Sequence, residues 1–144
     1  MGRRQPEALA YSLAGRAVIA ALLGLDVYDA WQVGRYADAS ITVPPSRLGL
    51  EAEVTAYYAG CEAERRWAEQ ASMALPEGPT EFELRAQIIL EQLGGGAEPR
   101  LRKLAAALVA EKWSAIQAVA ETLLGPRQSI SGDEIVELIL EAQK

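Results

Sequence analysis

Hydrophobic residues recur at helical spacing near the start of the chain, from Leu9 to Leu23. The proline at position 6 suits the first turn of a helix, and Gly24 suits its end. The pattern therefore predicts a first helix over about residues 6–23. Apolar residues lie on nearly all sides of this helix, which is typical of a helix at the centre of a fold.

The pattern changes after this first helix. Between Asp26 and Val43 a mix of β-branched and aromatic residues surrounds Gly34, and this mix predicts a short β-hairpin. A second helix is predicted from residue 47 or 48 to about residue 70, because apolar side chains recur there at alternating steps of four and three. Glu64 lies on the same apolar stripe.

Further helices are predicted in the second half of the chain. Thr80 and Glu83 have the spacing of a capping box, so a third helix begins there and ends before the three glycines at 94–96. Apolar spacing then predicts a fourth helix over 101–124, whose length of about 25 residues implies a kink or a long antiparallel partner. A second capping box at 131–134 marks the start of the last helix.

Composition supports a mostly α fold in one domain. Alanine supplies 26 residues, whereas Phe, Trp and Tyr together supply nine, which favours closely packed helices over a sheet-rich fold. The 144 residues fit a single domain, and a hydrophobic content of 50% is typical of a globular protein. We therefore expect one mostly α domain over 1–144, with about five helices and one short β-hairpin between the first and second helices.

Charge and cysteine content exclude several classes of function. Twenty acidic and fourteen basic residues give a net charge of −6, and the basic residues are scattered, so nucleic-acid binding is not expected. The longest apolar run, residues 17–25, is shorter than the ~20 residues that span a bilayer, so no membrane segment is expected. Cys61 is the single cysteine and the chain has no histidine, which fits a reducing cytoplasm and a structural cysteine.

Three stretches of the sequence resemble one family of enzymes. Residues 14–20, AGRAVIA, are similar to part of the H-E-A-G-H-A-V-V-A helix of the FtsH-type ATP-dependent zinc metallopeptidases. Residues 59–64, AGCEAE, are similar to the family's A-G-R-A-A-E segment. Residues 113–137 resemble its C-terminal pattern, a helix ending in A-x-x-L-L followed by a short turn and x-x-G-x-E-I. The resemblance covers most of the chain in the family's order and implies a fold like that of the FtsH peptidase domain.

The resemblance also implies that the metal chemistry is missing. In H-E-x-x-H, two histidines one helical turn apart bind zinc, and the glutamate acts as general base. The matching positions are Ser12, Leu13 and Arg16; leucine cannot take a proton, and arginine repels a cation. No metal, cofactor or peptidase activity is therefore expected. The family's third ligand, an acid that opens a later helix, falls near Glu81 or Glu83, and the sequence does not choose between them.

Arg16 requires an explanation of its own. Ser12 and Arg16 lie on one stripe of the first helix, and an unpaired buried charge costs several kcal/mol. Arg16 either extends to the surface, or replaces the metal as the positive charge and pairs with Glu64, Glu81 or Glu83, or binds an anionic ligand in the former cleft. These three interpretations stay open at the level of sequence.

The leading hypothesis for function is a non-catalytic binding module, a pseudopeptidase that holds a peptide, a protein partner or a second copy of itself. The active family aligns its substrate on an edge strand beside the metal helix, and residues 26–43 resemble that strand. Tyr28, Trp31 and Tyr36 are candidate anchors for the partner, or they cover the core. The sequence contains neither the family's membrane segment nor its ATPase module, so we expect a free-standing, degenerate relative.

Two other functions remain open. A purely structural or assembly role in a larger complex needs no site at all. An enzyme with rebuilt chemistry would use paired carboxylates whose environments separate their pKa values. The residues available for such chemistry are Ser12, Glu62, Glu64, Glu81 and Glu83.

Overall fold

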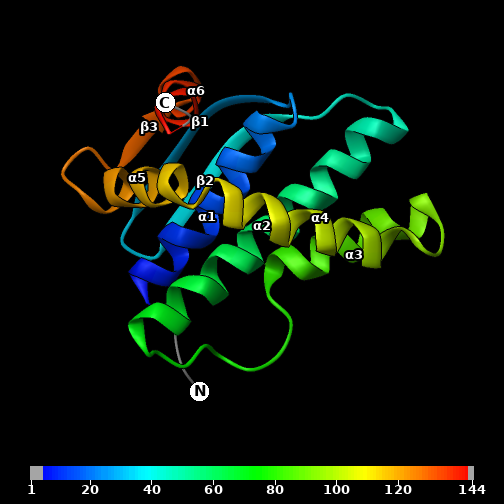
Figure 1. Cartoon of the computed structure of the whole chain (residues 1–144), viewed down its shortest axis with the longest axis horizontal. Helices are drawn as coiled ribbons and strands as arrows, with labels where there is room; N and C mark the ends of the chain where they lie inside the picture. Colours follow the sequence, from blue (N-terminus) through cyan, green and yellow to red (C-terminus); the bar gives the residue numbers. More distant parts are fainter. Residues whose placement is uncertain (1–4, 143–144) are drawn as a thin grey trace.

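The computed structural model describes residues 5–142, and these form a mostly helical fold with a small antiparallel sheet, as expected (Figure 1). The helices are α1 (Pro6–Leu22), α2 (Arg47–Ala71), α3 (Glu81–Leu93), α4 (Ala97–Glu111), α5 (Trp113–Leu124) and α6 (Gly132–Glu141). The strands are β1 (Asp26–Val33), β2 (Tyr36–Thr42) and β3 (Ser129–Ser131). The first helix, the hairpin and the second helix therefore lie where the sequence predicted them.

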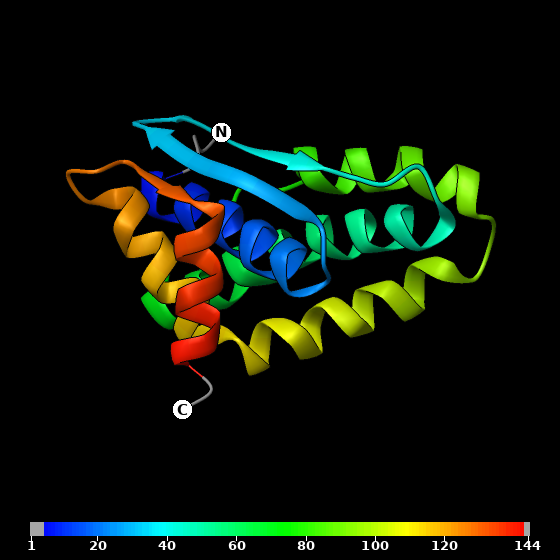
Figure 2. The ribbon, with the colours of Figure 1, turned by 90° about the horizontal axis from the view of Figure 1, so that it is seen from above.

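Helix α1 lies at the centre of the fold and contacts α2, α5, α6 and the sheet. Its approach to α2 requires a glycine, because a Cβ on Gly15 would lie 2.6 Å from the Cβ of Ala63 and 2.7 Å from the carbonyl oxygen of Ala59. Such separations are well below van der Waals contact, so any side chain would force the two helices apart. Figure 2 shows the sheet lying across one side of α1, away from α4.

The sheet has the strand order β2-β1-β3, and both neighbouring pairs are antiparallel. The β1–β2 hairpin confirms the prediction, and Gly34 supplies the positive φ of 61° that its two-residue turn requires. Strand β3 was not predicted; it places Ser129 opposite Trp31, which also pairs with Asp38 of β2. Strand β2 is thus an outer strand, and no other strand among residues 5–142 pairs with its outer edge.

The predicted fourth helix is two helices, so the described chain has six helices where about five were expected. The chain changes direction at Lys112, whose φ and ψ are −105° and 22° (Figure 2, yellow α4 and orange α5). Backbone hydrogen bonds continue across the junction, because the Lys112 amide donates to Leu108 at 2.9 Å and the Ile116 amide donates to Lys112 at 3.0 Å. Helix α4 packs mainly on α2 and α5 mainly on α1, and these different partners account for the kink.

Both predicted capping boxes are confirmed. The Glu83 amide donates to Thr80 Oγ1 at 3.2 Å, and the Glu134 amide donates to Ser131 Oγ at 3.2 Å. Glu134 is held further by Arg127, whose two terminal nitrogens donate to its two carboxylate oxygens at 2.5 and 2.6 Å. The hydrogen bonds from Arg127 and from the Ser131 amide lower the pKa of Glu134 to about 2.

We expect this low pKa to be visible by carboxyl NMR titration. Replacing Arg127 by glutamine should move the pKa of Glu134 up towards its ordinary value of 4.5, because the largest cause of the shift is lost. The stabilisation from a lowered pKa is present above about 4.5 and is lost as the pH falls through about 2. Arg65→Gln, on another helix, is the control, and equal Glu134 titrations in the parent and Arg127→Gln proteins would contradict the pairing.

Candidate functional site

The three positions that match the family's metal helix are all buried in α1. Ser12 is 1% exposed, Leu13 is 2% exposed and Arg16 is 7% exposed. The expected stripe therefore faces the protein interior, and Arg16 does not extend into open solvent. A buried serine, a leucine and an arginine offer no set of metal ligands.

A small pocket lies beside Leu13, where α1, β2 and α3 meet. Its volume is about 130 Å³, which is room for a group the size of one side chain and not for a large cofactor. Its apolar lining residues are buried or half-buried, and its charged lining residues are exposed. The lining residues are Leu9, Leu13, Ala37, Asp38, Glu81, Phe82 and Arg85.

Arg16 lies behind this pocket and forms an ion pair with Asp38. Arg16 Nη1 is 3.6 Å from Asp38 Oδ1, which is beyond hydrogen-bonding distance, and this nitrogen has no hydrogen-bond partner. The guanidinium lies 4.8 Å from the ring centre of Tyr57 and 5.5 Å from that of Phe82. These two rings supply cation–π contacts and hold the arginine in place.

The acidic residues considered as partners of Arg16 are distributed differently from the expectation. Glu81 lines the pocket and pairs with Arg85 at 2.6 Å, so it is the acid at the start of α3 that lies nearest the pocket residues of α1. Glu83 instead caps α3 and lies 3.7 Å from Arg102. Glu64 is buried in α2. The ion pair to Asp38 was not anticipated from the sequence.

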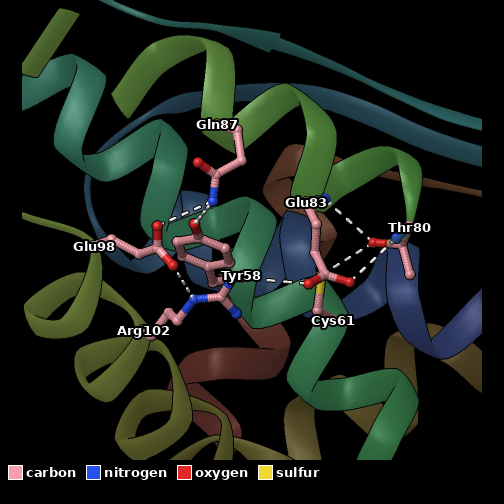
Figure 3. Close-up of polar contacts among 7 residues, drawn as sticks. All are labelled: Tyr58, Cys61, Thr80, Glu83, Gln87, Glu98 and Arg102. Carbon is pink, nitrogen blue, oxygen red and sulfur yellow. Dashed lines mark hydrogen bonds and ion pairs between the residues drawn. The ribbon is translucent and has the colours of Figure 1, made fainter. Parts of the chain in front are cut away.

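Glu83 belongs to a separate polar cluster that joins α2, α3 and α4 (Figure 3). The Arg102 guanidinium lies 4.1 Å from the ring centre of Tyr58 and donates to Glu98 at 3.0 Å. Gln87 donates to the same carboxylate at 3.0 Å and to the Tyr58 hydroxyl at 3.4 Å. The polar groups of this cluster bond to one another across α2, α3 and α4. The cluster therefore stabilises the packing of these three helices and does not form an open site.

Two residues of α2 belong to the surroundings of the pocket and were not singled out from the sequence. Hydrogen bonding to Tyr57 raises the pKa of Arg85. Burial raises the pKa of Glu53, although Arg16, Arg85 and a hydrogen bond with Tyr57 act in the opposite direction. Glu53 and Tyr57 are four residues apart and therefore lie on one face of α2. This spacing was the only feature of the sequence that could have indicated their contact.

We expect Glu53→Gln to raise the free energy of unfolding at pH 7. A raised pKa means that the ionised carboxylate destabilises the fold, and this cost sets in as the pH rises from 4.5 through the folded-state pKa. At about pH 3.5 the substitution should change little, because the carboxyl is then mostly protonated in both states. Urea unfolding at both pH values measures the difference, with the exposed Glu91→Gln as control. A loss of stability at pH 7 would contradict the assignment.

The candidate aromatic anchors lie on the outer face of the sheet. Tyr28 and Tyr36 are each 78% exposed, so the alternative that they cover the core is wrong for these two. Trp31 is 37% exposed and pairs with Asp38, which places it next to the pocket rim. Tyr36 belongs to β2 itself, whereas Tyr28 lies on the central strand β1 and lines a different pocket with residues of β3.

The remaining sequence candidates do not gather at the pocket. Glu62 pairs with Arg65 on the surface of α2, at 2.6 Å. Cys61 Sγ lies 3.3 Å from the hydroxyl of Thr80. Within residues 5–142, no group of three or more His, Cys, Asp or Glu side chains is arranged to hold a metal ion. None of the helices in that range has the length and apolar character needed to cross a membrane.

Comparison with known proteins adds no relative. No protein-family model matches the chain, and a search of curated proteins finds no match. The resemblance to the FtsH-type peptidase domain therefore stays a prediction that depends on the quoted motifs.

Proposed function

We propose that this protein is a non-catalytic binding module that holds an extended segment of a peptide or protein partner along the outer edge of β2. The observation that carries the proposal is the position of that edge. It has no strand partner among the described residues, and it lies directly beside the pocket at Leu13. An unpaired edge offers main-chain hydrogen bonds, and an adjacent pocket offers a place for a side chain, which are the two requirements of strand addition.

The walls of the pocket define what the docked segment would present. Leu9, Leu13 and Phe82 supply apolar surface, so we expect a small apolar side chain to enter. The exposed ring of Tyr36, on β2 itself, is suited to contact the partner, whereas Tyr28 lies on the central strand β1 and is farther from this edge. A second copy of this chain is one candidate for the partner.

The absence of catalysis rests on side-chain chemistry. At the positions that would carry a nucleophilic water and its metal, Ser12, Leu13 and Arg16 supply neither a general base nor a cation site. A helix without metal ligands or a general base can still lie beside the β2 edge and the pocket at Leu13. Binding of an extended segment needs only this edge and this pocket.

The proposal is tested with a phage-displayed pool of random ten-residue peptides and the variant Ala37→Pro. The Ala37 amide faces the outer edge, where a proline blocks an incoming strand without removing a bond to β1. Peptides selected on the parent should lose about ten-fold or more in affinity for Ala37→Pro. Circular dichroism and thermal unfolding verify that the variant folds.

Two outcomes would contradict peptide binding at this edge. One is a selection that enriches no sequence on either the parent or Asp38→Ala, and the other is a set of peptides that bind parent and Ala37→Pro equally well. Analytical ultracentrifugation of the same two proteins tests the second copy as partner. Self-association of the parent that Ala37→Pro abolishes would identify the docked segment as part of this chain.

A further inference from the structure

The hydrogen-bonding phase of β2 determines which of its amides face the outer edge. In an antiparallel pair, residues whose groups bond to the neighbouring strand alternate with residues whose groups point away. Gln32 lies opposite Ala37, and its amide donates to Gln128 at 2.8 Å, on the side away from β2. Ala37 is therefore in the outward phase, and Ala39, opposite Ala30, is in the same phase. The Ala39 amide is one of the donors that strand addition would use.

That donor is already occupied. The Ala39 amide donates to Oδ1 of Asp38 at 2.8 Å, so the carboxylate of the preceding residue lies over the outer edge. The same oxygen is the one that faces Arg16 Nη1 at 3.6 Å. The Asp38 side chain is 59% exposed, whereas that of Arg16 is 8% exposed. An exposed carboxylate thus lies at the edge beside a cation that the protein keeps buried.

The arginine is fixed by its surroundings rather than by hydrogen bonds. Its guanidinium contacts the rings of Tyr57 and Phe82, and its Nη1 is fully buried without a hydrogen-bond partner. A buried guanidinium whose donor is unsatisfied attracts the nearest carboxylate, although water around the exposed Asp38 side chain screens part of the interaction. Moving Asp38 away would remove the ion-pair partner of Arg16 and leave Glu53 as a more weakly placed counter-charge, and this opposes displacement.

We propose that Asp38 and Arg16 form an edge latch, an autoinhibitory contact that closes β2 to an incoming chain. This inference rests on the proposed function, since it assigns a regulation to the same edge. Before another chain can pair with Ala39, the hydrogen bond from the Ala39 amide to Asp38 must break. Release of the latch frees that amide and clears Asp38 from the rim of the pocket. The edge is thereby protected from indiscriminate pairing, as outer strands in soluble proteins generally are.

The first test needs no ligand. Amide hydrogen exchange by NMR should show Ala39 protected in the parent, and Asp38→Ala should exchange about ten-fold faster at this amide after correction for intrinsic rates. Arg16→Met, which keeps an unbranched side chain against the rings of Tyr57 and Phe82, should make the Ala39 amide exchange several-fold faster. Ser40→Ala, next on the same strand, is the matched control and should leave Ala39 unchanged. Equal Ala39 exchange in the parent and Asp38→Ala proteins would overturn the latch.

The second test uses the random ten-residue peptide pool on the parent and on Asp38→Ala. The latch predicts about ten-fold greater enrichment, or correspondingly tighter binding of the selected peptides, on Asp38→Ala. Equal binding to both proteins would overturn it. A third outcome is that no peptide is enriched on either protein, while the Ala39 amide exchanges faster in Asp38→Ala as expected. This outcome would support the closed edge and would contradict peptide binding as the function. The two proposals therefore fail in different experiments.

Discussion

Replacing Gly132 by alanine should destabilise the protein by at least about 3 kcal/mol, near the upper end of what overpacking costs. Gly132 is the first residue of α6, where the helix begins directly against β1. A Cβ at this position would lie 1.7 Å from the carbonyl oxygen of Val27 and 2.8 Å from its carbonyl carbon. Both are main-chain atoms, so no rotamer change relieves the overlap. Relief requires α6 and β3 to move away from β1.

Urea unfolding followed by circular dichroism measures this effect. Gly95→Ala is the matched control, because a Cβ on Gly95 meets no atom within 4 Å and the residue has no positive φ. We expect the control to change stability by less than about 0.5 kcal/mol. If Gly132→Ala and Gly95→Ala unfold at the same urea concentration, the close approach of α6 to β1 is wrong.

Arg16→Ala should cost about 2–4 kcal/mol, the second largest effect that we expect. The cause is packing: the change removes the side chain that lies against the rings of Tyr57 and Phe82 and leaves a space beside them. It does not come from stranding a buried acid, because the Asp38 side chain is 59% exposed. Arg16→Met should recover most of the loss, since methionine refills the space without a charge that needs desolvation.

The comparison with Asp38→Ala separates packing from charge. That change removes the counter-charge and leaves the packing around Arg16, so we expect a cost of about 1 kcal/mol or less. The three proteins are compared by urea unfolding at one ionic strength. An Arg16→Met protein as unstable as Arg16→Ala would show that the charge, and not the volume, stabilises the site.

Local signals in the sequence predicted most of the helices and the hairpin. Thr80 and Ser131 begin helices because each is followed three residues later by a glutamate, and this pattern involves no distant contact. Apolar spacing continues through Lys112, so periodicity alone could not divide α4 from α5 beyond indicating a kink. Strand β3 has only three residues and owes its structure to pairing with β1, which no local pattern contains.

The candidate site was predictable only in part for the same reason. The apolar character of the first helix predicted that it is largely buried, but whether Arg16 extends to the surface stayed open until the structure placed it inside. The pairing of Arg16 with Asp38 depends on how the hairpin crosses α1, and sequence spacing does not determine that. The burial of Glu53 and its electrostatic interaction with Arg16 and Arg85 depend likewise on how α2 packs beside α1 and α3. A single sequence does not determine which helices and strands contact one another, and these residues depend on such contacts.

The order of strands in the sheet has a consequence for synthesis of the chain. Asp29 near the start pairs with Ser131 near the end, and α1 is covered in part by α5 and α6. When the ribosome has made only the first half of this sequence, α5 and α6 are not yet present. The apolar faces of α1 that contact these two helices in the folded protein are then uncovered. Completion of the core must wait for residues 129–141 to emerge, and contacts this distant in sequence also slow folding. A chain stalled or cleaved before residue 129 would therefore expose its central helix and become a target for chaperones and proteases.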